Sequence, residues 1–143
     1  MTTARTALAE LMDEMPNAIQ GDKERWLDWA TAYGMSLPIP NIFGRYTVLP
    51  YHDLHHVVTG YGTDQFGECE MGAWGLAAGG APPIGRFFDT MTTCLGLLFC
   101  RKRTLAAWRA GRGCRPLYQI PLHQLLDMEI AELREWVQEE RVC

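Results

Sequence analysis

The sequence predicts an all-α fold, a single compact domain of about six helices over residues 1–143, and three observations support this prediction. Apolar residues recur at helical spacing in several segments, and strand-like alternation is scarce. Prolines gather in three loops, at residues 36–50, 78–85 and 111–121. Hydrophobic residues make up 48% of the chain and charged residues 21%, which is the ordinary balance of a globular domain.

Helical spacing along the first half of the chain is interrupted by proline and glycine. The pattern i, i+3, i+4, i+7 of one helical face first occurs at Trp26, Trp29, Ala30 and Tyr33. Residues 45–49 predict a short extended segment. Residues 51–59 predict a short helix, because Pro50 stands at its start and Gly60 directly follows its end.

The second half of the chain predicts three more helices. The one that follows Gly60 contains Gly67, Gly72 and Gly75, which we expect to allow close approach of a neighbouring helix. A longer helix reaches to about Ala110, and we expect its apolar stripe to lie in the core: Phe87, Met91, Cys94, Leu95, Leu98 and Phe99. A last stripe is formed by Leu126, Ile130, Leu133 and Val137.

Charge and cysteine content restrict the class of protein. The net charge of -4 argues against nucleic-acid binding. Five unevenly spaced cysteines suit free thiols in a reducing compartment, and no secretory signal pattern opens the chain. The most apolar stretch, residues 84–100, contains Arg86 and Asp89 and is too short for a membrane span. We therefore expect a cytoplasmic protein. Peripheral contact with the inner face of a membrane, through basic residues between 101 and 115, and homodimer formation are left open.

A candidate metal site lies in residues 51–59. His52 and His56 are four residues apart, so on a helix their imidazoles share one face and can chelate one cation. Asp53 borders that face and can serve as a ligand, a general base or a partner of a ligand. The alternative is a chance pair of helical histidines, since isolated pairs of this kind are common. We expect His55 to be exposed or to support a ligand.

The site needs a further oxygen donor, which we expect from the next helix, running antiparallel to the first. Glu68 and Glu70 are both candidates, and spacing alone does not choose between them. Glu68 can instead be an ordinary surface glutamate in the first turn of its helix, where the helix dipole favours a negative charge.

The segment His52-Asp53-x-x-His56, followed after eleven residues by Glu68, resembles the HDxxH-x11-E motif of the Coq-four family of ubiquinone (coenzyme Q) biosynthesis proteins. Gly60 stands where that family has a glycine after the motif. Three later segments, beginning at Ala107, Arg115 and Ala131, resemble the closing part of the family, so the likeness extends from residue 51 onward.

This resemblance implies an all-helical protein with a divalent metal, usually zinc, held by His52, Asp53, His56 and Glu68. It also implies a groove for a prenylated ring precursor of ubiquinone. Family members are associated with oxidative decarboxylation of that ring, and with organising other ubiquinone-biosynthesis enzymes on a membrane surface.

Two hypotheses follow for the function. In the first, Zn, Fe, Mn or Co acts as a Lewis acid on a carboxylated prenyl ring, and Asp53 or His55 moves a proton. In the second, the chain is a non-catalytic scaffold that binds isoprenoid lipid, and its metal site is structural. An HD-type phosphohydrolase is disfavoured, because that chemistry needs a histidine upstream of the His-Asp pair and no histidine precedes His52.

Overall fold

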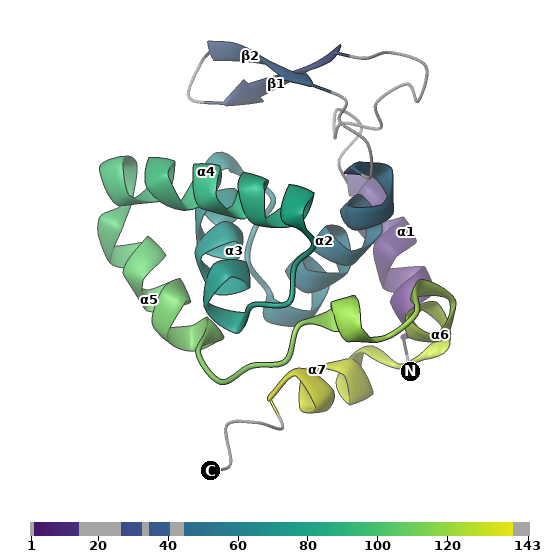
Figure 1. Ribbon diagram of the computed structural model, residues 1–143. Helices are drawn as coiled ribbons and strands as arrows, with labels where there is room; N and C mark the ends of the chain where they lie inside the picture. Colours follow the sequence, from purple (N-terminus) through teal and green to yellow (C-terminus); the bar gives the residue numbers. More distant parts are fainter. Residues whose placement is uncertain (1, 15–26, 33–34, 41–44, 139–143) are drawn as a thin grey trace.

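The computed structural model describes residues 2–14, 27–32, 35–40 and 45–138 (Figure 1). Within these residues the fold is all-α apart from one small hairpin, so the predicted fold class is confirmed. The elements are α1 (Ala4–Glu14), β1 (Leu27–Ala32), β2 (Met35–Pro40), α2 (Arg45–Thr59), α3 (Gln65–Ala78), α4 (Pro83–Phe99), α5 (Arg101–Gly111), the 3-10 helix η1 (Leu117–Gln119), α6 (Leu122–Asp127) and α7 (Ile130–Gln138).

The hairpin replaces the helix predicted around Trp29. Strands β1 and β2 are antiparallel, and Trp29 pairs with Pro38. Prolines interrupt a helix, but an edge strand tolerates them where the missing N–H would face outward. Pro38 and Pro40 are two residues apart, so both lack a donor on the same side of β2. The apolar spacing was too short to distinguish a helix from a strand, and Trp26 and Tyr33 lie outside the described residues.

Helix α2 is longer than predicted. It begins at Arg45, so the extended segment predicted at residues 45–49 is wrong, and Pro50 lies inside the helix. The first four N–H groups of any helix have no partner within it, so a proline at the sixth position removes only one internal hydrogen bond. The predicted end is confirmed, since Gly60 adopts φ 78° and its N–H donates to the His56 carbonyl at 2.8 Å.

Helix α3 packs against α4 and α5 (Figure 1). Its start is capped by Asp64, whose Oδ1 accepts the N–H of Gly67 at 2.6 Å. The close approach expected from the glycines is confirmed at Gly72, where an added Cβ would overlap the Thr92 side chain and lie 2.9 Å from the Asp89 carbonyl oxygen. The α3–α4 contact therefore depends on the absence of a side chain at this position.

Replacement of Gly72 by alanine is expected to lower the free energy of unfolding by about 1–3 kcal/mol, because overpacking forces neighbouring groups apart. Urea denaturation measures this change. The matched control is Gly62→Ala, since an added Cβ there meets its nearest atom at 3.7 Å. Equal stability of the two variants would contradict the packing described for α3 and α4.

The long helix predicted up to Ala110 is divided in two. Helix α4 ends at Phe99, and α5 begins at Arg101 after Cys100, whose φ of -143° and ψ of 45° are not helical. The break turns the chain so that α5 returns along α3. The last apolar stripe is likewise divided between two helices, α6 and α7. The core contains the fully buried side chains of Leu54, Leu117, Leu125 and Leu133.

The apolar stripe of α4 was predicted to lie in the core, and this prediction is wrong. Phe87 is 55% exposed, Leu98 77% and Phe99 58%, with Met91 and Cys94 also on the surface. The buried face of α4 is formed instead by small and polar residues, namely Gly85, Asp89, Thr93 and Gly96. Among the described residues, no helix combines the length and the apolar character that a membrane crossing requires.

Candidate metal centre

Three side chains from the consecutive helices α2 and α3 converge on one point. His52 and His56 come from α2, and Glu68 comes from the first turn of α3. The two Nε2 atoms are 3.0 Å apart. The Glu68 carboxylate reaches both rings, with Oε2 at 3.1 Å from His52 Nε2 and Oε1 at 3.3 Å from His56 Nε2. These distances join the only group of potential ligand atoms of this kind within the part of the chain described.

The spacing of this group fits a metal ion. Ligand atoms about 2.0–2.1 Å from a tetrahedral zinc are about 3.4 Å from each other, and the three donor separations lie close to that value. Two imidazole nitrogens and a carboxylate oxygen suit Zn, Mn, Fe or Co, and the group does not identify one of them. His52, His56 and Glu68 could therefore hold a divalent cation.

The second nitrogen of His56 supports this assignment. His56 Nδ1 lies 3.1 Å from the Tyr61 carbonyl oxygen, which can only accept, so Nδ1 carries the proton. In the neutral ring, Nε2 then presents its lone pair to the group. Metal-binding histidines are commonly oriented by such a carbonyl, and here it comes from the turn that Gly60 makes after α2.

Without a cation, the group is held as an ion pair. Burial lowers the pKa of His52, but the charge and hydrogen bond of Glu68, with smaller effects of Asp53 and Asp89, raise it to about 9. Burial raises the pKa of Glu68, but His52 and His56 outweigh it and hold this pKa far below its usual range. A metal ion must displace the proton of His52 in order to bind.

Asp53 is the predicted ligand that the structure does not bring into the group. Its oxygens are not among the converging ligand atoms. Burial raises the pKa of Asp53, and the charges of His52 and His56 oppose this rise without cancelling it. The charges of the group therefore affect the pKa of Asp53, but Asp53 does not supply a fourth ligand atom.

His55 points away from the group and into the core. Its ring lies 5.3 Å from that of Trp74 and 5.2 Å from that of Tyr118, and Nε2 accepts the N–H of Leu117 at 3.0 Å. The expectation of an exposed His55 is wrong, because only 3% of the residue is accessible. Burial, with a smaller effect of His52, lowers its pKa to about 3, so the ring is neutral. This arrangement favours a role in joining α2 to η1.

Glu70 faces a different partner. Its carboxylate accepts two hydrogen bonds from Arg103 of α5, at 2.9 and 2.6 Å. The alternative that spacing left open is therefore resolved by the geometry, since Glu68 meets the histidines and Glu70 does not.

Sequence reasoning missed Asp89 as a member of this region. Asp89 lies on the buried face of α4 and is 7% exposed. Burial raises its pKa to about 7, with His52 opposing and Glu68 adding to the rise. The pKa of Tyr118 is raised by burial and by Asp89. The sequence signal for Asp89 is its place as the single carboxylate within the most apolar stretch, residues 84–100.

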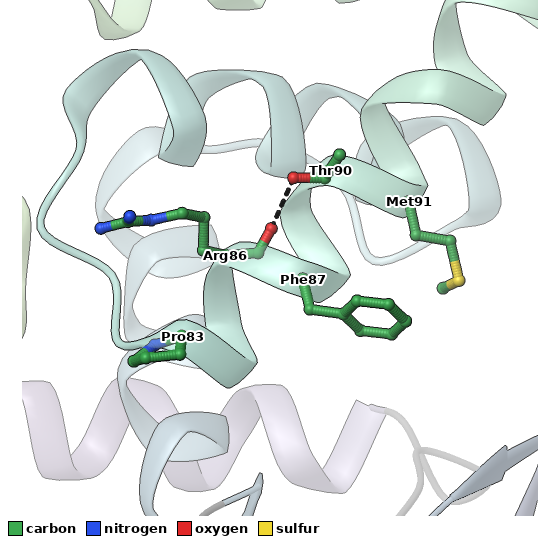
Figure 2. Close-up of a pocket in the computed structure, with 5 residues that line it drawn as sticks. All are labelled: Pro83, Arg86, Phe87, Thr90 and Met91. Atoms are coloured by element: carbon green, nitrogen blue, oxygen red, sulfur yellow. Dashed lines mark hydrogen bonds between the residues drawn. The ribbon is translucent and has the colours of Figure 1, made fainter.

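A second surface feature lies on the outward side of α4. Figure 2 shows a shallow hollow lined by Pro83, Arg86, Phe87, Thr90 and Met91. Thr90 donates from Oγ1 to the Arg86 carbonyl at 2.7 Å, and the Arg86 guanidinium donates to the Ala81 carbonyl at 3.4 Å (Figure 2). The hollow combines an apolar wall with one cationic group.

No protein-family model matches the chain, and no curated protein or solved structure matches it significantly. The class of protein is therefore defined by the fold and the site. The chain is a helical protein with a His-His-Glu group that could hold a metal ion.

Proposed function

We propose that this chain is a divalent-metal protein that acts on a prenylated aromatic ring precursor of the ubiquinone type and removes the ring carboxyl carbon by oxidative decarboxylation. The observation that carries the proposal is the convergence of His52, His56 and Glu68 from two consecutive helices. These residues occupy three of the four ligand positions of the HDxxH-x11-E pattern. The substrate class is supported by the resemblance of that pattern to the Coq-four family.

The proposed reaction assigns separate tasks to these residues. A divalent cation would act as a Lewis acid on the carboxylate or phenolate of the substrate. His52, His56 and Glu68 would hold the cation, and the Asp53 carboxylate could accept or return a proton beside them. For a ring with a hydroxyl opposite the carboxyl group, the reaction balances as acid plus dioxygen giving quinone, carbon dioxide and water.

A second candidate function is an isoprenoid-binding scaffold in which the metal only joins α2 to α3. It is favoured by the exposed apolar stripe of α4 and by the hollow beside Arg86 (Figure 2). Such a protein would present lipid to other ubiquinone-biosynthesis enzymes. In either case we propose a cytoplasmic location with peripheral contact at the inner face of a membrane.

The test begins with elemental analysis of protein purified without added metal. Metal-loaded and chelated protein are then incubated with a prenylated hydroxybenzoate labelled at its carboxyl carbon, under oxygen and under nitrogen. Labelled carbon dioxide is expected only from loaded protein under oxygen. Absence of labelled carbon dioxide from loaded protein would overturn the enzymatic proposal. Co-purified isoprenoid, detected by native mass spectrometry, would then support the scaffold.

A further inference from the structure

Within the described part of the chain, the carboxyl group of Asp89 is buried and its oxygens have no hydrogen-bond or ion-pair partner. The residue is 7% exposed, and its backbone carbonyl accepts Thr93 Oγ1 at 2.6 Å. Among the described residues, no hydrogen bond or ion pair ends on its side-chain oxygens. Burial of such a group is costly unless a cation or a hydrogen-bond donor accompanies it. Asp89 therefore offers a buried acceptor that none of the described residues satisfies.

Asp89 lies on a third helix, α4, on the face that packs against α3, the helix that carries Glu68. Its carboxyl group packs against α3, where an added Cβ at Gly75 would lie 2.9 Å from Oδ2. Its charge acts on His52 and Glu68 of the group, and on Tyr118. The close α3–α4 contact at Gly72 keeps this part of α4 against α3. Glu68, Gly72 and Gly75 are spaced i, i+4 and i+7, so the packing that joins the two helices holds Asp89 on the face of α3 that also carries Glu68.

We propose that Asp89 accepts the hydrogen bond of the proton-bearing ligand of the metal centre, which is water in the resting protein and a ring hydroxyl in the substrate complex. This inference rests on the metal centre of the proposed function. Three protein donors leave a four-coordinate cation one position for such a ligand. Carboxylates next to a metal commonly orient its ligands, and loss of one typically weakens metal binding. Asp89 is a positioning residue for this water, and it favours hydroxylated rings as substrates.

The first experiment compares Asp89→Asn with the wild-type chain by competition between the protein and a chelator for Zn²⁺. Affinity is expected to fall about 10- to 100-fold in the variant. The control is Asp127→Asn, which also replaces a carboxylate by an amide, at an exposed position paired with Arg5. If the wild-type chain binds no metal, the proposed function fails. If the wild type binds and Asp89→Asn binds equally well, only the role of Asp89 fails.

The second experiment separates this role from general damage to the fold. Azide is added to Co²⁺-loaded protein, and the visible absorption of the cobalt reports anion binding at the open position. Asp89→Asn is expected to bind azide at least about 5-fold more tightly, because a nearby negative charge has been removed. A disturbed site would instead bind both the metal and the anion more weakly, and that result would overturn the proposal.

Gly75→Ala provides a variant that keeps every charge. The added Cβ must displace the Asp89 carboxyl group, since it would lie 2.9 Å from Oδ2, and alanine favours the helix. Zn²⁺ affinity is expected to fall several-fold, in the same direction as for Asp89→Asn. Wild-type affinity in a folded Gly75→Ala variant would contradict a role that depends on the position of the carboxyl group.

Discussion

Replacement of Glu68 by glutamine is expected to lower the affinity of the chain for Zn²⁺ by more than about 100-fold, since loss of a ligand should exceed the loss seen for residues that only orient ligands. Glu68 supplies the only oxygen of the converging group, and its carboxylate spans both imidazoles. Glutamine keeps the size of the side chain but removes the charge that balances the cation. Competition with a chelator of known affinity measures the change.

The matched control for this variant is Glu70→Gln, two residues further along α3. Its carboxylate binds Arg103 and not the histidines, so the substitution should leave Zn²⁺ affinity within experimental scatter. If the two variants lose equal affinity, the loss reflects the net charge of α3 and the proposed ligand set is wrong.

Replacement of His55 by alanine is expected to lower the free energy of unfolding by about 3–4 kcal/mol at neutral pH. The substitution removes a buried ring that lies between Trp74 and Tyr118, and it leaves the N–H of Leu117 without an acceptor. Urea denaturation of the chelated protein measures the change, which excludes any contribution of metal binding. His123→Ala is the control, because His123 is exposed, and it should change stability by less than about 0.5 kcal/mol.

The destabilisation caused by His55→Ala should itself depend on pH. The pKa of His55 is about 3 in the folded chain and about 6.5 when unfolded. The stability that the neutral ring contributes is therefore fully present above about pH 6.5 and is lost as the pH falls from there toward 3. The difference between wild type and His55→Ala should shrink between about pH 7.5 and about pH 4.5. A constant difference over this range would show that His55 becomes charged without penalty.

The sequence was sufficient to predict the helices that carry the metal group. The spacing of His52 and His56 places both rings on one face, and that geometry follows from the helical repeat alone. Spacing alone did not choose between Glu68 and Glu70, and only the resemblance to the HDxxH-x11-E motif favoured Glu68. The physical reason lies in the structure, because α5 places Arg103 against Glu70. The same limit explains the error on His55, since the face it occupies is buried only when α3 and η1 pack against α2.

Other differences arise because helical periodicity identifies an apolar face without identifying what covers it. The stripe of α4 that includes Phe87 and Leu98 is regular in the sequence but remains exposed. The opposite face is buried because glycines let α3 approach, and this places Asp89 against α3. A lone carboxylate in an apolar segment was the one visible sign of that arrangement.

The exposed stripe of α4 also carries two sulfur-containing side chains that are open to oxidation. Cys94 and Met91 lie on this surface, whereas Cys69 and Cys114 are buried. Peroxide would therefore oxidise the Met91 thioether and the Cys94 thiol to polar groups, and this would lower the hydrophobicity of the surface. The His-His-Glu group contains no sulfur, so its donors would remain intact. Oxidation would thus make the exposed surface of α4 more polar while leaving the nitrogen and oxygen donors of the His-His-Glu group unchanged.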